Sequence, residues 1–384
     1  MENLFNYNWE LCKLKEITER VKGNDGRMDL PTLTISASQG WLNQKDRFSG
    51  NIAGKEQKNY TLLLKNELSY NHGNSKLAKY GAVFSLKTYE EALVPRVYHS
   101  FKSTKNSDPD FLEYIFATKK PDKELGKLVS SGARMDGLLN INYDDFSNIK
   151  INIPHVHEQK KISNLLRKID DTIALHQRKL DQLKELKKAY LQLMFPKKDE
   201  TVPQVRFANF EENWELCKLE NIIEKQIKGK AKVENLCNGS VEYLDANRLN
   251  GGKPIYTKAL PDVSERDIII LWDGSKAGKV YYGFKGVLGS TLKAYQLKEC
   301  ANSQFIYQQL LDNQNNIYNN YRTPNIPHVV KNFSSIFPIW MTSFEEQSQM
   351  ADILSNLDNR IILQQNLTDT MISLKKSYLQ NMFI

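Results

Sequence analysis

Two stretches in the first third of the chain, residues 39–60 and Asn71–Lys76, hold the side chains best suited to binding a polar ligand. Both mix glycine with amide and cationic groups. Amide and guanidinium groups can pair with the edges of nucleic-acid bases, and lysine ammonium groups neutralise phosphates. The alternatives are a solvated surface loop for the first stretch and a plain hairpin turn for the second. The candidate contact residues are Gln39, Trp41, Lys45, Arg47, Lys58, Asn71, His72, Asn74, Ser75, Lys76 and, in a further polar loop, Arg134.

Similar loops recur in the second half of the chain. Asp273 aligns with His72 and could accept a hydrogen bond from a cytosine amino group, although capping its own turn is the more ordinary role. Arg322 could enter a groove or could only anchor its loop. Lys276 and Lys279 would contact phosphate if their turn faces DNA. The candidates here are Lys228, Lys230, Asn247, Arg248, Trp272, Asp273, Ser275, Lys276, Lys279 and Arg322.

Motifs that would give the chain a reaction of its own are missing from the sequence. The run GSKAGKV at Gly274–Val280 has the wrong spacing for a phosphate-binding loop, and Val280 stands where serine or threonine would hold magnesium. The Asn/Asp-Pro-Pro-aromatic signature of adenine methyltransferases is absent. His155 and His157 have no cysteine or suitable acidic ligand set nearby, so no metal site is predicted. We therefore expect a non-catalytic chain.

The bulk properties set the class of protein. A chain of 384 residues is too long for one ordinary core, so two or more domains are expected. The net charge of +8 suits a polyanion such as nucleic acid, although many basic proteins bind nothing anionic. The four cysteines are widely spaced, so neither a zinc site nor a disulfide framework is indicated, and the equivalent repeat positions of Cys12 and Cys217 favour small buried residues in a reducing compartment. The sequence shows no signal peptide and no membrane-spanning run, and a cytoplasmic location is expected.

Two long stretches, Ile162–Phe195 and Met350–Phe383, are each predicted to form one helix. Their apolar residues recur at alternating steps of four and three, which is the seam pattern of a coiled coil. The second stretch repeats the first 188 residues later, and the endings LKKAYLQLMF and LKKSYLQNMF nearly match. A lone helix cannot bury such a stripe, so we expect the two helices to pair within the chain.

A second repeat divides the chain into halves. The motif WELCKL occurs at Trp9–Leu14 and at Trp214–Leu219, and each copy precedes a segment of short β-prone runs, turns and one helix. The helix is expected to begin near Asp110 in the first segment, with Asp108 or Asp110 as its cap, and to span Ser303–Tyr318 in the second. The predicted fold class is therefore α+β, with two tandem domains that contain twisted, mostly antiparallel sheets. The predicted division is a first domain at 1–153, a first helix at 154–196, a linker at 197–213, a second domain at 214–337 and a second helix at 338–384.

The order of these features resembles the specificity subunit of type I restriction–modification systems. The resemblance rests on the Pro…Glu-Gln helix starts, the LKKxYLQxMF endings and VPQVRFANFEENWELCKL at Val202–Leu219, which is similar to the start of a target recognition domain. The runs YNHGNSK at Tyr70–Lys76 and LWDGSKAGKV at Leu271–Val280 resemble the turn inside such domains. The family's usual preamble is short here, since only eight residues precede Trp9.

The resemblance implies a DNA-recognition protein without an active site. Each target recognition domain would read one half of a split, asymmetric duplex DNA sequence, and the antiparallel helices would fix the gap. Two modification subunits would bring S-adenosylmethionine and methylate adenine. Two restriction subunits would add the ATP- and magnesium-dependent motor and nuclease. The chain itself would hold no cofactor.

The middle of each predicted helix carries a polar residue, His176 in the first and Gln364 in the second, at equivalent heptad positions. We expect a central polar layer that sets the register of the pair. Two other interpretations stay open. The chain could be a coiled-coil adaptor that binds only protein, or an enzyme whose site is not recognisable in the sequence.

Overall fold

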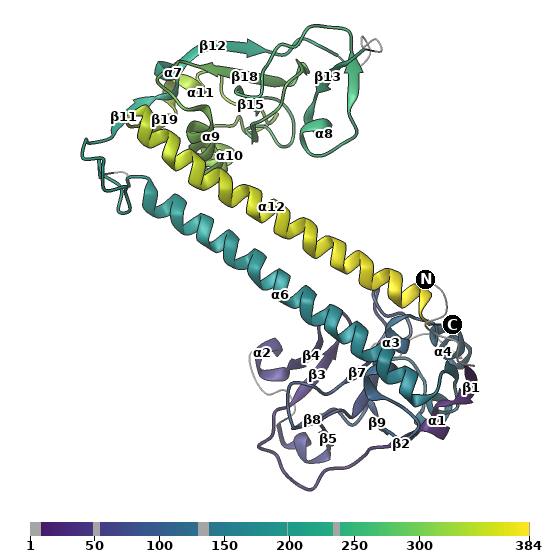
Figure 1. The fold of residues 1–384 in the computed structure, drawn as a ribbon. Helices are drawn as coiled ribbons and strands as arrows, with labels where there is room; N and C mark the ends of the chain where they lie inside the picture. Colours follow the sequence, from purple (N-terminus) through teal and green to yellow (C-terminus); the bar gives the residue numbers. More distant parts are fainter. Residues whose placement is uncertain (1–8, 49–53, 130–137, 198, 233–238, 384) are drawn as a thin grey trace. The chain divides into compact units, whose positions relative to one another are not determined.

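The computed structural model describes residues 9–48, 54–129, 138–197, 199–232 and 239–383 (Figure 1). The chain forms two compact units. Unit 1 contains Met1–His176 and Leu367–Ile384, and unit 2 contains Gln177–Asn366. Each unit thus combines one α+β domain with half of each long helix. This division cuts both helices near their middles, so it does not test the predicted domain boundaries.

The domain of unit 1 is built from short antiparallel strands. Its main sheet has four strands in the order β2-β9-β6-β7, and three further antiparallel pairs surround it: β3-β4, β5-β8 and β1-β10. The strands are β1 (Glu10–Lys13), β2 (Thr18–Arg20), β3 (Leu33–Ser36), β4 (Gly40–Asn43), β5 (Thr61–Leu64), β6 (Leu68–Asn71), β7 (Ala82–Ser85), β8 (Glu91–Val94), β9 (His99–Ser103) and β10 (Lys150–Ile153).

An aromatic core fills the space between the main sheet of unit 1 and its helices. Tyr70 stacks on Phe146 with ring centroids 4.4 Å apart, and Phe111 stacks on Phe383 from the end of the second long helix at 5.2 Å. Of the two expected caps, Asp108 is the one that begins α3, because its side chain accepts a hydrogen bond from the Phe111 amide. The helices are α1 (Leu14–Ile17), α2 (Gln44–Phe48), η1 (Gly54–Asn59), α3 (Pro109–Ala117), α4 (Asp122–Leu128) and α5 (Tyr143–Ser147).

The domain of unit 2 repeats this plan with different details. A four-stranded antiparallel sheet has the order β12-β18-β15-β16, and a three-stranded sheet has the order β14-β13-β17 with one parallel pair. The elements are β11 (Glu215–Lys218), α7 (Leu219–Ile222), β12 (Ile223–Lys228), β13 (Val241–Leu244), α8 (Ala246–Leu249), β14 (Ile255–Thr257), β15 (Ile268–Leu271), β16 (Val280–Tyr281), β17 (Val287–Leu288), β18 (Leu292–Leu297), α9 (Ser303–Asp312), α10 (Gln314–Asn320), α11 (Phe333–Ile336) and β19 (Pro338–Met341). Together the two domains confirm the α+β class with mostly antiparallel sheets.

The repeated WELCKL motif forms the strand that closes each domain beside its long helix. In unit 1, β1 pairs with β10, which places Cys12 opposite Ile151. In unit 2, β11 pairs with β19, which places Cys217 opposite Ile339. Both copies of the motif thus join the first strand of a domain to the strand that leads into its long helix.

The two long helices, α6 (Val156–Met194) and α12 (Phe344–Asn381), run antiparallel within each unit. In unit 1, Asp170 Oδ1 and Lys375 Nζ lie 2.5 Å apart, and in unit 2, Lys187 Nζ and Asp358 Oδ1 lie 2.6 Å apart. These two ion pairs are copies of each other under the 188-residue repeat. The predicted seam is buried in both units, at Ile162, Leu166, Ile169, Leu180, Leu183, Leu354 and Leu357.

The glutamine of each Glu-Gln helix start fastens the helix to the domain above it. The Gln159 amide nitrogen donates to the carbonyls of Asn106 and Pro154, and its oxygen accepts from the Asp108 amide. Gln347 makes the same three contacts in unit 2, with Cys300, Thr342 and Asn302. Both glutamine side chains are fully buried. Sequence reasoning placed the acidic residue at the helix start but missed this function of the glutamine.

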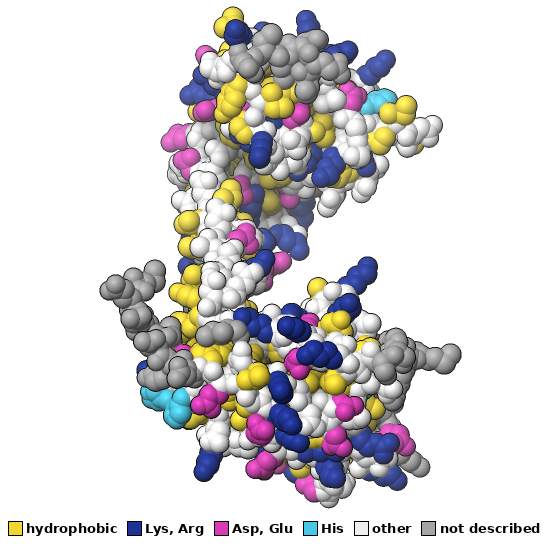
Figure 2. Space-filling view, turned by 90° about the vertical axis from the view of Figure 1, so that its right-hand side faces the viewer, with side chains coloured by type: hydrophobic (Ala, Val, Ile, Leu, Met, Phe, Trp, Pro, Cys, Tyr) yellow, Lys and Arg dark blue, Asp and Glu magenta, His cyan; other side chains and the backbone are white. Residues whose placement is uncertain are grey.

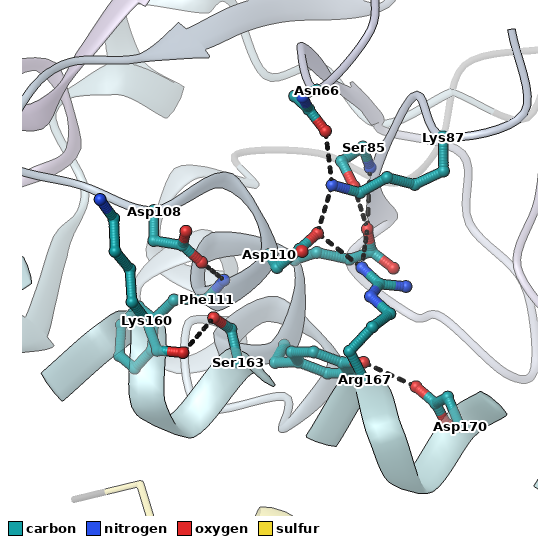
Figure 3. A network of polar contacts seen from close by, with 12 residues as sticks. Asn66, Ser85, Lys87, Asp108, Asp110, Phe111, Lys160, Ser163, Arg167 and Asp170 are labelled. Atoms are coloured by element: carbon teal, nitrogen blue, oxygen red, sulfur yellow. Dashed lines mark hydrogen bonds and ion pairs between the residues drawn. The ribbon is translucent and has the colours of Figure 1, made fainter. Parts of the chain in front are cut away.

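Polar side chains tie α3 to α6 in unit 1 (Figure 3). Asp110 on α3 accepts from Arg167 on α6 and from Lys87, each at 2.6 Å. Tyr114, one turn along α3, donates to Asp170 at 2.7 Å. Burial, and then the hydrogen bond to Asp170, raises the pKa of the Tyr114 hydroxyl, so the hydroxyl remains a donor. The domain is therefore held on the helix by charged contacts as well as by its core.

The helix predicted over Ser303–Tyr318 is interrupted, and this corrects the sequence-based expectation. It consists of α9 and α10, which meet at Asn313. The Asn313 side-chain amide donates to the Gln309 carbonyl at 3.0 Å, which also accepts the Asn313 backbone N–H at 3.1 Å, so side chain and main chain share one acceptor at the end of α9. An asparagine that competes with the main chain in this way favours a helix end.

Candidate nucleic-acid interface

The two predicted loops of unit 1 meet around one hollow of about 620 Å³. Arg47 lies on one side, and the turn after β6 lies on the other. Asn71 shapes the turn, because its side chain accepts from the Gly73 amide and donates to the Ile35 carbonyl. The Ser75 hydroxyl oxygen accepts a hydrogen bond from the Ala78 amide. Asn74, Lys76 and Leu77 are exposed at the rim on the side of this turn.

Two other candidates of unit 1 are engaged inside the domain. The ring nitrogens of His72 lie 2.7 Å from the Leu139 carbonyl and 2.9 Å from the Val97 carbonyl, and the side chain is buried. Trp41 is half-buried and donates to the Ser85 carbonyl at 3.1 Å. Both side chains order the loops. Gln39, Lys45 and Lys58 are exposed, and Arg134 lies outside the described residues.

In unit 2 the structure joins the turn at residues 272–279 to the loop at 321–328. The Gly274 amide donates to the Pro327 carbonyl at 3.0 Å, and Asp273 pairs with His328 in a β-bridge. Arg322 donates to the carbonyls of Tyr318 and Ser275. Arg322 therefore anchors the two loops to each other. Asp273, Ser275 and Lys276 stay exposed on this joint surface.

A lysine that sequence reasoning missed lies behind this turn. Lys293 Nζ lies 3.3 Å from the centroid of the buried Trp272 ring, and burial lowers the pKa of the Lys293 ammonium group. Lys293 on β18 also lies opposite Lys228 on β12. The sequence does contain a signal for this lysine, because it stands alone between the apolar residues Leu292 and Ala294. Side chains alternate along a strand, so Lys293 lies on the opposite face from these two buried neighbours.

The remaining candidates of unit 2 lie around α8 and β16. Arg248 pairs with Glu242, whereas its neighbour Asn247 is exposed. Lys279 contacts the Asn250 side chain and lies over the Tyr281 ring at 5.2 Å. The structure therefore gives Arg248 and Lys279 partners within the domain.

The remaining candidate lysines carry uncompensated positive charge. In the described part of the chain, six of them form no ion pair with a carboxylate: Lys45, Lys58, Lys76, Lys228, Lys230 and Lys276. Figure 2 shows Lys and Arg side chains lying in a row across the visible face of unit 1, the lower body of that view. Unpaired ammonium groups on a domain surface are the groups that neutralise phosphates.

Each half of the helix pair also carries exposed leucines at corresponding positions. In unit 1 these are Leu175 on α6 and Leu374 on α12, with exposed fractions of 63% and 39%. Their counterparts in unit 2 are Leu363 on α12 and Leu186 on α6, at 61% and 40%. Each unit therefore presents one such pair of leucines, although other exposed apolar residues of α12, such as Leu367 and Ile372, correspond to lysines on α6.

The predicted register residues His176 and Gln364 fall in different units, and their layer stays a prediction. Gln364 is buried, so a polar side chain does lie within the seam there.

Among the residues that the structure describes, no three histidine, cysteine, aspartate or glutamate side chains gather closely enough to hold a metal ion. None of the helices in the described ranges combines the length and apolar character that a membrane span needs.

Comparison with known proteins gives one consistent result. The sequence model of the family described as "Type I restriction modification DNA specificity domain" matches residues 6–185 and 211–371. The type I restriction enzyme MjaVIII specificity subunit of Methanocaldococcus jannaschii is 30% identical over 195 residues. That match covers 48% of this chain and 45% of the relative, so it spans about half the length of either protein.

Solved structures show the same fold. The S subunit of a type I restriction–modification system from M. genitalium superposes with a TM-score of 0.70 at 16% identity, over 100% of this chain and 98% of that one. A chain from a study of complex assembly and conformational transition of the type I R-M system gives 0.52 at 12% identity, over 99% and 98%.

Proposed function

The chain belongs to the type I restriction–modification DNA specificity family, and from this we propose that each of its α+β domains reads one half of a split, asymmetric DNA sequence. One observation carries the proposal. The two domains share the strand pair formed by the WELCKL motif and the three hydrogen bonds of Gln159 or Gln347, which we call the glutamine clamp. The exposed side chains on their turns differ. Two domains of similar structure with different exposed turn residues are suited to binding two different half-sites.

The proposed contacts divide into two kinds. Asn74 in unit 1 and Asp273 and Ser275 in unit 2 are exposed on turns and would contact base edges. Lys76, Lys228 and Lys276 would contact phosphates, which position a domain on the duplex but carry no sequence information. The resulting affinity would depend steeply on salt because each phosphate contact releases counterions.

The helix pair would set the gap between the half-sites and bind the modification subunits. The register of each half is held by one copy of the Asp–Lys ion pair. The matched exposed leucines, Leu175 with Leu374 and Leu363 with Leu186, give each unit one corresponding apolar pair. Two copies of one partner would be bound in this way, which supports the expected pair of modification subunits.

Catalysis would come from those partners. In this proposal, the modification subunits bring S-adenosylmethionine and methylate adenine. The restriction subunits use ATP and magnesium for translocation and cleavage. This chain would supply DNA recognition and assembly alone.

Sequencing the methylated adenines of a host that carries the intact system tests the proposal. We expect two short half-sites separated by a fixed gap. The double substitution Asp273→Asn with Ser275→Ala should alter one half-site only. Glu265→Gln, which removes one exposed carboxylate away from that turn, should leave both half-sites unchanged. A change in neither half-site, or in both, would contradict the assignment of one domain to each half-site.

The alternative is an adaptor that binds only protein through its helices. The exposed leucines would serve that function equally well. Binding of the purified chain to duplex DNA, measured between 50 and 200 mM salt, separates the two, because an adaptor would show no salt-dependent binding to DNA.

A further inference from the structure

The loop between α10 and α11 in unit 2 carries a tip of three exposed residues, 324–326. Hydrogen bonds within the loop fix its backbone. The Thr323 amide donates to the His328 carbonyl at 3.0 Å, and the Thr323 hydroxyl donates to the Ile326 carbonyl at 2.6 Å. Pro324 and Pro327 restrict the backbone further, because each proline ring fixes its own φ angle. The tip is therefore restrained before any ligand binds.

This tip lies beside the turn of unit 2 that is proposed to contact DNA. The Pro327 carbonyl, directly after the tip, accepts a hydrogen bond from the Gly274 amide at 3.0 Å. Ser275 and Lys276 follow Gly274 on that turn, and both are exposed. A duplex that contacts these two side chains therefore comes within reach of the tip.

The tip presents an amide and an apolar side chain next to each other. Asn325 is exposed, and its side chain makes no hydrogen bond within the described part of the chain. Ile326 is 74% exposed, and among the described large apolar side chains only Leu260 is more exposed, at 85%. A single exposed isoleucine is ordinary on a protein surface. An exposed isoleucine beside an unpaired amide on a restrained loop is a more specific combination.

This combination matches the groups that A·T base pairs display in the major groove. Adenine presents the N7 acceptor and the N6 amino donor there, which together pair with the side-chain amide of an asparagine. Thymine presents its C5 methyl group, which apolar side chains contact. The minor groove offers no methyl group, so only the major groove suits both side chains.

We propose that Asn325 and Ile326 together read an A·T-containing step of the half-site that unit 2 binds, through the major groove. Asn325 donates to adenine N7 and accepts from the adenine N6 amino group, and Ile326 packs against a thymine methyl group. The inference rests on the proposed function, because it requires the adjacent turn to contact DNA. It adds two specificity residues to the contacts of that turn.

Duplexes with altered bases test the two contacts separately. Mapping of methylated adenines supplies the split site, and a fluorescein-labelled duplex with that site is titrated with the full chain. Uracil in place of thymine removes only the C5 methyl group. At one thymine of one half-site this change should weaken binding about fourfold, the effect of burying one methyl group. At one adenine, 7-deazaadenine removes the N7 acceptor and should weaken binding about fivefold, as for one lost hydrogen bond.

Variants of the tip should each abolish one of these responses. Ile326→Ala should bind the thymine and uracil duplexes equally, and Asn325→Ala should bind the adenine and 7-deazaadenine duplexes equally. Both side chains are exposed, and the loop is held through the main chain of Ile326, so neither variant should disturb the fold. Leu260→Ala removes an exposed leucine outside this loop and should leave both responses unchanged.

The possible results separate this inference from the function on which it rests. If the wild-type chain prefers the split site but the variants keep the full response to every altered base, the inference alone is overturned. If the wild-type chain shows no preference for the split site, the proposed function is overturned as well. Methylated-adenine mapping with Ile326→Ala in the intact system gives a second readout. One position of one half-site should then accept other bases, and an unchanged map would count against the inference.

Discussion

At the scale of single residues, a pair of stacked histidines joins the main sheet of unit 1 to the segment before α5. The rings of His72 and His99 lie 4.9 Å apart and nearly parallel, and His99 Nε2 lies 2.9 Å from the Ile141 carbonyl. Burial, helped by the nearby His72 and Arg20, lowers the pKa of His99 to about 4. The folded domain therefore holds His99 in its neutral form at neutral pH.

This arrangement predicts that unit 1 loses stability in mild acid. Below pH 6.5 the unfolded chain binds a proton at His99, whereas the folded domain resists protonation until about pH 4. Stability should therefore fall as the pH falls through this window, by up to about 3 kcal/mol. Free energies of unfolding from urea titrations between pH 7 and 4.5 would measure it.

The substitution His99→Asn should make the free energy of unfolding less dependent on pH in this range. It should also lower the stability at pH 7, because the stacking of the two rings is lost. The exposed His155 provides the control, since His155→Asn should leave the slope unchanged. An unaltered slope in the position 99 variant would assign the acid sensitivity to another group.

Removing a single exposed lysine should lower the affinity for DNA but should not change which DNA sequence the protein prefers. Lys276→Gln removes one unpaired charge from the turn of unit 2. We expect weaker binding to all duplexes alike and a salt slope smaller by about one. Lys65→Gln removes a lysine whose charge Glu90 already balances, and it should have little effect. Fluorescence anisotropy at several salt concentrations would show the difference.

Whether a candidate residue faces solvent could not be predicted from the sequence alone. His72 and Asn74 belong to one short turn, yet His72 is buried and Asn74 is exposed. The difference arises because the His72 ring meets the Leu139 carbonyl, 67 residues further along the chain. Trp272 is buried in the same way, under Lys293 from a strand that is distant in sequence. Local composition identifies a polar turn but not the side chains that the rest of the domain covers.

At the scale of elements, the glutamine of each Glu-Gln helix start has the same function in both halves. Gln159 and Gln347 each bind three backbone groups of their domain and so fix the start of the long helix to it. Gln159→Ala would remove one partner each from the buried Pro154 carbonyl and from the Asn106 carbonyl and Asp108 amide, whose bonds are partly buried and within reach of water. We expect unit 1 to lose about 2–3 kcal/mol of stability, since each unmet buried group costs about 1–3 kcal/mol.

Hydrogen exchange would locate this effect. The amides of Asp108 and Phe111 should exchange faster in Gln159→Ala, while the corresponding amides Asn302 and Phe305 keep their protection. Gln347→Ala should give the reverse pattern, and Gln182→Ala, on the exposed face of α6, should change neither. Faster exchange in both units from one substitution would contradict independent clamps.

The long helices and most strands could be predicted because their signals are local. The heptad pattern predicted helices at Ile162–Phe195 and Met350–Phe383, and the structure extends both toward their N-termini. The pairing of β1 with β10 could not be predicted, since nothing in WELCKL specifies a partner about 140 residues away. The interruption at Asn313 was missed because an asparagine within an otherwise helical run gives only a weak signal.

At the scale of the whole molecule, the proposed spacer function makes a quantitative prediction. Four residues inserted in phase into each long helix would lengthen it by roughly 6 Å. The gap between half-sites should then grow by about two base pairs, since a turn of duplex is roughly 34–36 Å for about 10 base pairs. Methylated-adenine mapping would report the new gap. Altered half-sites, with the gap unchanged, would contradict the spacer model.

The interleaved make-up of the two units has a consequence for the order in which the protein folds. Unit 2 is one continuous stretch, Gln177–Asn366, so all of it leaves the ribosome before the last part of unit 1. Phe383 belongs to the aromatic core of unit 1, where it contacts Trp9 and Phe111. The domain that is synthesised first must therefore wait for residues made last, and we expect nascent chains stopped near residue 366 to hold a finished unit 2 beside an open, protease-sensitive unit 1.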